Sequence, residues 1–290
     1  MELHTLQVFR MVATEGSFSR AAEKLFRTQP AISLAVQRLE TELGEKLIDR
    51  SGRDLVLTDA GRTVLDYATR FDSLRREMEN ALAELRDKSA GTLVIGANES
   101  TSLYLLRHIE RFRQMYAGVA VQIRRSLSSR IPSDLIDGDL ELGVVSYDPE
   151  DDRLGSVILY TDALVFIVSP RHRLAGQAEV SIRELGEETF IAHNVVSPYR
   201  EVVLKTFRRH KVPLRMPVEM PTIETIRKLV QGDQGVAFLP RMCVEQELEQ
   251  GTLCAVEVRE LQMERKIRLL FPAKRALSHA SRAFLDLVVQ

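Results

Sequence analysis

Apolar residues recur at helical spacing on both sides of a short polar turn in the stretch 17–43. Before the turn, Ala21, Ala22 and Leu25 share one face, and the two small alanines allow a second helix to approach closely. Pro30 follows the turn, and proline is tolerated in the first turn of a helix but not further in. The apolar stripe of the second helix consists of Ile32, Val36, Leu39 and Leu43. The pattern therefore predicts two short helices in contact, joined by a tight turn.

The opposite face of the second helix is slim and polar. Its residues are Pro30, Ser33, Leu34, Gln37, Arg38 and Thr41, with Thr28 and Gln29 at the leading end. Thr28 is a favourable N-cap, so we expect the helix to begin there. A helix-turn-helix has this design, because its second helix presents short hydrogen-bonding side chains to base edges in the major groove. Paired amphipathic helices are also common in all-α domains, so this stretch alone leaves DNA binding open.

The neighbouring segments add a further helix and a wing. Residues 3–13 carry an amphipathic helical pattern that precedes the pair. Gly44 is a favourable helix C-cap, and the segment 46–57 has the pattern of a β-hairpin. Arg50 and Arg53 flank the predicted tip of this hairpin. A helix-turn-helix followed by a hairpin is a winged helix, whose wing reaches the DNA backbone or minor groove.

Residues 1–65 resemble the DNA-binding domain of LysR-type transcriptional regulators. The matching signatures are LHTLQVFRMVATEGSFSRAAEKL, TQPAISLAVQRLETELGEKLIDR and LVLTDAGR. The resemblance implies that double-stranded DNA is contacted by Ser17, Arg20, Thr28, Gln29, Pro30, Ser33, Leu34, Gln37, Arg38, Arg50 and Arg53. The sequence departs from the family at Leu34, where a polar or basic residue is common, and at Ile48, where Phe is common. An exposed apolar residue at position 34 suits contact with a thymine methyl group.

A long helix follows the predicted wing. Thr58 is its expected cap, and no Pro or Gly interrupts the segment 62–89. Its apolar residues recur at heptad spacing and are Val64, Ala68, Phe71, Met78, Leu82 and Leu85. The charged remainder favours an exposed helix with one apolar stripe, although a helix packed on its own domain is the alternative. In LysR-type regulators the equivalent helix forms an antiparallel dimer, which this resemblance implies here as well.

Short β-branched runs alternate with helical patterns after Gly91. The predicted strands are 92–98, 119–126, 140–147, 156–170, 188–194, 235–240 and 266–272. The predicted helices are 102–116, 131–139, 198–211, 222–231 and 278–288. This alternation indicates parallel sheets with right-handed crossovers. Two such units, joined by crossing segments near Thr161-Asp162 and near Lys266, resemble the periplasmic-binding-protein-like effector domain of the same family.

The expected fold is therefore α/β and multi-domain, with a mainly helical N-terminal winged helix-turn-helix and an effector domain of two α/β subdomains. The predicted divisions are 1–58 for the DNA-binding domain, 59–89 for the linker and dimerisation helix, 90–162 with 267–290 for subdomain I, and 163–266 for subdomain II.

Open α/β sheets bind ligands outside the carboxyl ends of their strands. The polar residues that this rule selects are Asn98, Ser100, Thr101, Ser102, Ser128, Ser146, Asn194, Ser197, Tyr199 and Arg200. Some of them begin helices, where free N–H groups and the macrodipole favour an anion, although hydroxyls there are also ordinary caps. The resemblance implies a pocket between the subdomains, with a small carboxylate or related anion as effector and Ser100, Ser102, Ser197 and Arg200 as first choices. Glu99 and Glu224 would instead suit a ligand that carries an amine.

Composition limits the function classes. The chain has 290 residues, 44% hydrophobic and 28% charged, which is ordinary for globular domains. A net charge of -1 gives DNA binding no support, so the placement of the charges within the N-terminal region has to supply it. No apolar run approaches the roughly 18 residues that span a membrane, and no secretory signal is visible. Two cysteines, Cys243 and Cys254, are too few for a disulfide framework, so we expect a cytoplasmic protein.

Other site chemistries fit the sequence poorly. The six histidines show no metal-ligand spacing, and no phosphate-binding or dinucleotide motif is present, so we expect neither a metal nor a cofactor. A redox switch between Cys243 and Cys254 stays open as a minor alternative. A solute-binding protein would need an export signal, and an enzyme would need clustered titratable residues at the strand ends. We therefore predict a LysR-type regulator, not an enzyme, that works as a homodimer or homotetramer on a pseudo-palindromic operator. RNA polymerase is among the partners that the resemblance allows.

Overall fold

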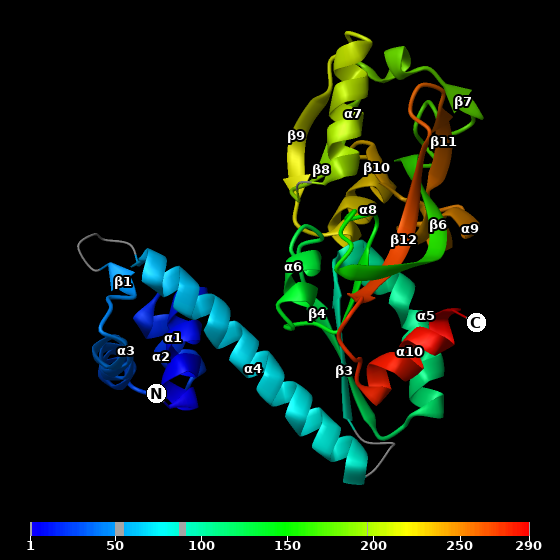
Figure 1. Cartoon of the computed structure of the whole chain (residues 1–290). Helices are drawn as coiled ribbons and strands as arrows, with labels where there is room; N and C mark the ends of the chain where they lie inside the picture. The colour runs from blue at the N-terminus through cyan, green and yellow to red at the C-terminus, as the bar shows by residue number, and fades with distance from the viewer. Residues whose placement is uncertain (1, 50–54, 87–90, 196, 290) are drawn as a thin grey trace.

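The computed structural model describes residues 2–49, 55–86, 91–195 and 197–289. Figure 1 shows three parts: a small helical N-terminal domain, one long helix, and a larger α/β region of two lobes. The N-terminal domain lies at one end of the long helix, and the α/β region begins at the other end. No helix in the described part of the chain has both the length and the apolar content needed to cross a membrane.

The N-terminal domain consists of α1 (Leu3–Glu15), α2 (Phe18–Lys24), α3 (Gln29–Leu43), β1 (Ile48–Asp49) and β2 (Val56–Leu57). The predicted apolar faces meet in one core, in which Ala21, Ala22, Val36 and Leu39 are fully or almost fully buried. Leu43, the last member of the predicted stripe, is exposed because it follows the final turn that packs on this core. α3 begins at the predicted residue.

The two ends of α3 are capped differently. Gly44 adopts the left-handed conformation with φ of 72°, as expected for a glycine C-cap. Thr28 occupies the N-cap with extended backbone, but its hydroxyl makes no capping hydrogen bond. An N-cap side chain bonds the N–H of the second or third helical residue, and Pro30, the second, has no N–H, which leaves only that of Ala31 as a donor. The prediction for Thr28 was thus right for the backbone and wrong for the hydroxyl.

The wing is fixed to α3 by a buried carboxylate. β1 and β2 pair antiparallel, with Ile48 opposite Leu57. Glu40 Oε1 accepts hydrogen bonds from the N–H groups of Leu47 (2.9 Å) and Ile48 (3.3 Å). Glu40 comes four residues after Val36, so it lies on the buried face of the helix. The predicted hairpin tip, with Arg50 and Arg53, lies outside the described residues.

The long helix α4 (Asp59–Arg86) begins where predicted, and Thr58 Oγ1 accepts a hydrogen bond from the N–H of Gly61 at 2.9 Å. Its first turns pack on the N-terminal core through Val64 and Ala68. Further along the helix, Asp72 forms an ion pair with Arg10 of α1, in which Arg10 Nη2 donates a hydrogen bond to Asp72 Oδ2 at 3.0 Å.

The exposed apolar stripe of α4 contains three of the predicted residues and two that were not predicted. Its exposed members are Tyr67, Phe71, Leu74, Met78 and Leu82, whereas Val64 and Ala68 belong to the core of the N-terminal domain. Arg75 pairs with Asp72 and Glu79, so its charge is held beside the stripe. The first turns of α4 are therefore packed on their own domain, and the rest of the described helix is exposed with one apolar stripe. The side chain of Leu85 lies outside the described residues.

The α/β region contains one eight-stranded sheet that runs through both lobes. Its strands are β3 (Gly91–Ala97), β4 (Val119–Arg125), β5 (Leu142–Val145), β6 (Leu154–Val168), β7 (Glu179–Val180), β10 (Ala237–Pro240), β11 (Cys254–Val258) and β12 (Met263–Pro272). The order is β4-β3-β5-β12-β6-β11-β7, with β10 also paired to β6. β3 pairs parallel with β4 and β5, but β12 pairs antiparallel with β5 and β6. The predicted parallel pairing is thus present between β3, β4 and β5, whereas the pairing of β12 with β5 and β6 is antiparallel and was not predicted.

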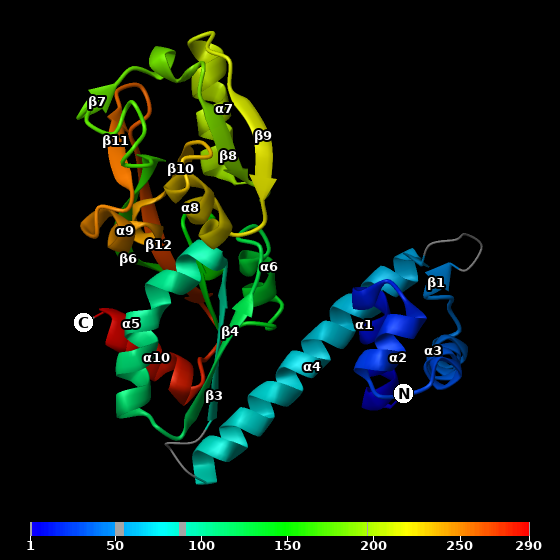
Figure 2. The ribbon, with the colours of Figure 1, turned by 180° about the vertical axis from the view of Figure 1, so that it is seen from behind.

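The first lobe is built on β3, β4 and β5. Its helices are α5 (Glu99–Met115), α6 (Ile131–Ile136) and α10 (His279–Val289). Figure 2 shows α5 and α10 beside each other on this lobe. Phe112 of α5 and Phe284 of α10 are both fully buried and pack edge to face, with ring centroids 5.4 Å apart.

The second lobe adds a parallel pair, β8 (Thr189–His193) and β9 (Arg215–Met220), which an isolated bridge joins to the chain before β10. Its helices are α7 (Pro198–Arg209), α8 (Ile223–Gln231) and α9 (Glu245–Glu249), with short 3-10 turns at Ile182–Leu185 and Arg241–Cys243. β7, β9 and β11 were not predicted as strands. β7 has two residues, and β9 contains Pro217, which favours an edge position and weakens a strand pattern.

The two lobes share a pair of strands. β6 and β12 pair along almost their whole length, with Thr161 opposite Lys266 and Asp162 opposite Arg265. Each strand passes from one lobe into the other, as Figure 1 shows. Residues from both lobes therefore meet at the middle of these strands.

Candidate functional sites

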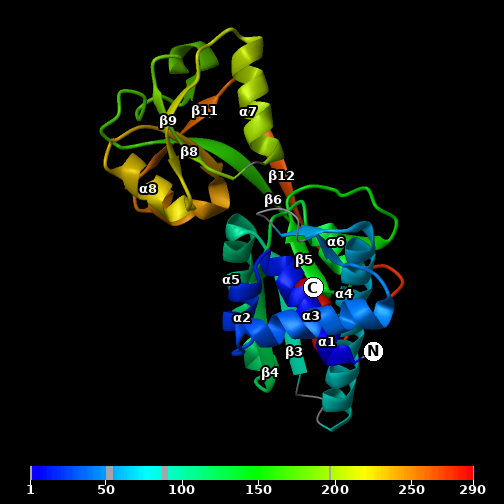
Figure 3. The same cartoon turned by 90° about the vertical axis from the view of Figure 1, so that its left-hand side faces the viewer.

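The outer face of α3 is the first candidate site. Thr28, Gln29, Pro30, Gln37 and Arg38 are exposed, and Ser33 is half-buried. Leu34 is 48% exposed. α3 lies on the side of the domain that faces away from the α/β region (Figures 1 and 3). This helix face is therefore open to a large ligand along its whole length.

Ser17 and Arg20, two of the predicted DNA contacts, form hydrogen bonds within the N-terminal domain. Ser17 caps α2, because its hydroxyl accepts a hydrogen bond from the N–H of Arg20 at 3.3 Å. The guanidinium of Arg20 donates to the carbonyl of Glu15, with Nε at 3.1 Å. These bonds fix the approach of the chain to α2, and contact of either side chain with DNA stays a prediction.

The second candidate site begins at the N-terminus of α5. Asn98 caps this helix, and its Oδ1 accepts hydrogen bonds from the N–H of Thr101 (2.9 Å) and the hydroxyl of Ser100 (3.0 Å). Asn98 Nδ2 donates to Ser128 Oγ at 2.7 Å. Thr101 is fully buried and its hydroxyl bonds Asn98 and the carbonyl of Val144. Thr101 is thus a capping residue in this arrangement, and its contact with an effector stays a prediction.

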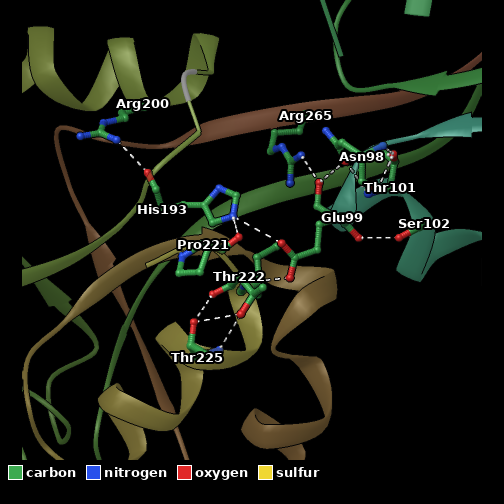
Figure 4. A network of polar contacts seen from close by, with 12 residues as sticks. Asn98, Glu99, Thr101, Ser102, His193, Arg200, Pro221, Thr222, Thr225 and Arg265 are labelled. Carbon is green, nitrogen blue, oxygen red and sulfur yellow. Dashed lines mark hydrogen bonds and ion pairs between the residues drawn. The ribbon is translucent and has the colours of Figure 1, made fainter. Parts of the chain in front are cut away.

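Glu99 connects the two lobes next to this cap. Its Oε1 accepts a hydrogen bond of 2.8 Å from the N–H of Ile223 in the first turn of α8. Its Oε2 lies 3.3 Å from His193 Nε2 at the end of β8. Figure 4 shows Glu99 reaching from the first lobe toward His193, Pro221 and Thr222 of the second. The carboxylate occupies the end of α8 at which free N–H groups favour a negative charge.

Tyr199 makes another connection between the lobes. It lies in the first turn of α7, and its hydroxyl donates to the carbonyl of Ser146 after β5. Ser146 is buried, so its backbone rather than its hydroxyl is the group in contact. Tyr147, the next residue, donates its hydroxyl to the carbonyl of Ser128 at 2.9 Å.

Arg265 lies at the centre of these contacts, and its side chain is only 4% exposed. Nη1 pairs with Asp162 Oδ2 at 2.9 Å, and Nη2 donates to Ser100 Oγ at 3.3 Å. Its guanidinium carbon is 4.8 Å from the centroid of the Tyr199 ring. The buried Nε has no hydrogen-bond partner among the described residues. One cation thus joins Ser100 of the first lobe to Tyr199 of the second.

Asp162 is the only carboxylate within the described residues that pairs with Arg265. Burial raises the pKa of Asp162, although the guanidinium and the N–H of Met242, which bonds Oδ1 at 3.1 Å, act in the opposite direction. Desolvation thus outweighs the attraction between the two charges, which is the usual weakness of a buried ion pair.

Arg265 and Asp162 were missed in the sequence, although β12 contains a signal for Arg265. Arg265, Ile267 and Leu269 alternate with more exposed residues, so Arg265 shares the buried face of the strand. A charge on the buried face of a predicted strand needs a partner, and this points to a site.

The other predicted effector contacts do not meet at Arg265. Ser197 caps α7, and Ser102 donates to the carbonyl of Glu99 at 2.8 Å. Arg200 donates to the carbonyl of His193 at 2.7 Å and pairs with Glu219. Asn194 is exposed after β8. The described residues thus bring together Asn98, Ser100, Ser128, Ser146 and Tyr199 from the predicted set.

The cysteines and possible metal ligands form no comparable site. Both thiols are free, and burial raises the pKa of Cys243 to about 12. A thiol in this state is a poor nucleophile, which disfavours a redox role. Among the described residues no group of three His, Cys, Asp or Glu side chains is placed to hold a metal ion.

Comparisons with known proteins identify the family. The model described as "Bacterial regulatory helix-turn-helix protein, lysR family" matches residues 3–62, and that described as "LysR substrate binding domain" matches residues 86–290. The chain belongs to the LysR family of transcriptional regulators. It is 34% identical to the "Probable RuBisCO transcriptional regulator" of Cyanophora paradoxa, over 98% of this chain and 90% of that protein.

Solved structures agree with the LysR assignment. Full-length CbnR in complex with its target DNA has a TM-score of 0.71 at 18% identity, over 100% of this chain and 99% of that chain, and therefore shows the same fold. The CcmR regulatory domain of Synechocystis PCC6803, solved with 2-PG, has a TM-score of 0.61 at 25% identity, over 68% of this chain and 95% of that chain. The LysR protein described here is thus a DNA-binding transcriptional regulator whose α/β region is a substrate-binding domain for a small molecule.

Proposed function

We propose that this LysR regulator reads its operator with the exposed face of α3 and responds to a small anion bound beside Arg265. The α3 contacts would be those predicted, from Thr28 to Arg38, supported by Ser17, Arg20, Arg50 and Arg53. The effector contacts would come from Arg265, Ser100 and Tyr199. The observation that carries this proposal is the buried Arg265 guanidinium, which touches both lobes and whose Nε has no partner among the described residues.

The charge of Arg265 favours a carboxylate or phosphate as the effector. A guanidinium offers several N–H donors in a fixed plane, which suits two oxygens of one anion. The 2-PG bound to the CcmR regulatory domain supports an effector of this class and is the first compound to test. The amine-bearing alternative has less support, because Glu99 already bonds Ile223 and lies beside His193.

Binding at Arg265 would act on the geometry of the two lobes. Arg265 and Asp162 lie opposite each other on β12 and β6, the strands that both lobes share. An anion that takes over part of the guanidinium loosens the contact with Asp162. A ligand shifts a conformational equilibrium only by its difference in affinity for the two states. Different contacts of Arg265 in the two arrangements would supply that difference.

The exposed stripe of α4 is the proposed dimerisation surface, in line with the oligomers that LysR regulators form. Its apolar residues continue along one face of an otherwise charged helix. The predicted division of the chain at residues 58, 89, 162 and 266 remains part of this proposal. We further propose that the effector is bound without being converted and that the protein works in the cytoplasm. The names of the relatives make the region upstream of a RuBisCO operon a suitable first DNA to test.

The experiment is a thermal-shift titration of the full-length protein with 2-PG. Asp162→Asn keeps the cation and removes its internal counter-charge, whereas Asp162→Asn with Arg265→Gln replaces the ion pair by a neutral pair. A ligand that binds only the folded state raises the Tm, by a free energy that grows with the logarithm of its concentration. We expect a shift for the wild type, an equal or larger one for Asp162→Asn, and none for the double variant. A Tm shift as large as that of the wild type in the double variant would show that Arg265 does not bind 2-PG.

A further inference from the structure

The turn between α2 and α3 contains an aromatic residue in an unfavourable backbone conformation. α2 ends at Lys24, and two hydrogen bonds close its end: Phe26 N–H to the carbonyl of Glu23 (3.2 Å) and Arg27 N–H to that of Ala22 (2.9 Å). These are the bonds of a Schellman motif, whose left-handed position favours glycine or asparagine. Phe26 occupies that position with φ of 51°.

Among the described residues of its own domain, none compensates Phe26 for this conformation by packing on its ring. The residue is 94% exposed, so its ring buries almost no surface on the chain. Two other helices end in the same motif with a non-glycine residue, and there the residue is Lys211 (φ of 57°) or Asp233 (φ of 59°). Those charged side chains are well solvated, whereas an exposed phenyl ring gains nothing from water. Strain that is retained without a local benefit is typical of functional positions.

Phe26 is next to the surface that reads DNA. It precedes Thr28, the N-cap of α3, by two residues, and the Thr28 hydroxyl is not used for capping. The first residues of a recognition helix are those that contact base edges. Leu34 is a second exposed apolar residue on α3. No ion pair holds the neighbouring Arg27 within the described residues, so its charge is available to phosphates.

We propose that Phe26 makes an apolar contact with operator DNA at the mouth of the major groove, against a thymine methyl group or a deoxyribose. The ring would then be buried only in the complex, and its contact would add specificity to the polar contacts of α3. This inference rests on the DNA-binding function proposed for α3. Phe26 is not among the predicted DNA contacts, and it lies in the turn between α2 and α3 rather than on α3.

Phe26→Asn tests the inference on the full-length protein, because asparagine tolerates the left-handed conformation. Lys211→Asn is the control, since it places asparagine at the same left-handed position of the same motif in the second lobe. We expect both variants to have a Tm equal to or above that of the wild type. Fluorescence anisotropy with the region upstream of the protein's own gene should show about 3- to 10-fold weaker binding for Phe26→Asn, the loss expected for part of an aromatic surface. Lys211→Asn should bind as the wild type does.

A second DNA probe with uracil in place of thymine identifies the group that is contacted. Weaker binding of this probe by the wild type but not by Phe26→Asn indicates the thymine methyl, and equal binding indicates deoxyribose. A lower Tm for Phe26→Asn, or unchanged affinity, overturns the inference. Unchanged affinity with altered transcription would assign Phe26 to RNA polymerase and overturn it as well. Failure of the wild type to bind any fragment would instead contradict the DNA-binding function itself.

Discussion

Glu40 shows how one buried carboxylate can position a DNA-binding element. Its Oε1 accepts two backbone N–H groups at the start of the wing, and Oε2 is 3.4 Å from Lys46 Nζ. The wing strands have only two residues each, so they bring little stability of their own. The hydrogen bonds of Glu40 therefore decide where the wing begins relative to α3.

Glu40→Ala should destabilise the N-terminal domain by about 1–3 kcal/mol, because it leaves the buried N–H groups of Leu47 and Ile48 without an acceptor. Glu40→Gln retains one acceptor oxygen and should cost less. Thermal unfolding of the full-length variants measures the effect, with the exposed Glu45→Ala as control. Equal Tm values for Glu40→Ala and Glu45→Ala would contradict the positioning role.

Cys243 provides a pH-dependent prediction. Burial raises the pKa of its thiol from 9.0 to about 12, so the native thiol stays protonated while the unfolded thiol ionises. Because only the unfolded thiol ionises in this range, the free energy of unfolding is unaffected below pH 9 and decreases as the pH rises from 9 toward 12. We expect alkylation of Cys243 to stay slow in the native protein at pH 10 and to become fast in denaturant, as measured by peptide mass spectrometry. Fast native labelling would show that the thiol is accessible and restore the redox alternative.

At the scale of elements, α4 combines two roles that its sequence pattern does not separate. Its first turns are part of the N-terminal core, and Asp72 connects it to Arg10 of α1. Its apolar stripe continues beyond this contact into solvent. A dimer formed along the stripe would therefore hold each DNA-binding domain at a fixed angle.

Leu74→Ala combined with Met78→Ala should raise the dimer dissociation constant by at least about tenfold, since two buried aliphatic side chains contribute more than the 1.4 kcal/mol that a factor of ten requires. Sedimentation equilibrium measures this change. Glu79→Ala, a truncation beside the stripe, should have little effect. An unchanged dissociation constant for the double variant would exclude the stripe as the dimer surface.

The sequence predicted elements with strong periodicity and missed contacts that depend on tertiary structure. α3 begins at the predicted residue because Thr28, Pro30 and the apolar stripe all indicate the same boundary. The predicted stripe of α4 contains Phe71, Met78 and Leu82, which are exposed, but it also contains two residues of the N-terminal core. Val64 and Ala68 look the same in sequence whether a core or a partner covers them. Strand β11 was missed because it is short and only Val256 and Val258 are buried.

The candidate effector site was predicted in part for the same reason. The rule of strand ends found Asn98, Ser100 and Tyr199, because their positions follow from local pattern. Arg265 and Asp162 meet only through the pairing of β6 with β12, at a sequence separation of 103 residues. The pairing of Asp162 with Arg265 across these strands cannot be read from the local sequence pattern of either strand.

At the scale of the whole molecule, the described contacts connect the sensor lobes through one pair of shared strands. Arg265 and Asp162 lie at the middle of that pair, and Glu99 and Tyr199 bridge the lobes beside it. A ligand at Arg265, as proposed, would therefore lie where a small change in contacts would alter the angle between the lobes. The dimer along α4 would carry that change to the two DNA-binding domains.

The most direct test of this account is a DNase footprint of full-length protein on its operator, at fixed salt, with and without 2-PG. We predict that 2-PG changes the protected length or the affinity for the wild type. The variant with Asp162→Asn and Arg265→Gln should give the same footprint in both conditions. Equal responses of the wild type and this variant to 2-PG would contradict the claim that an anion at Arg265 controls how the protein binds DNA.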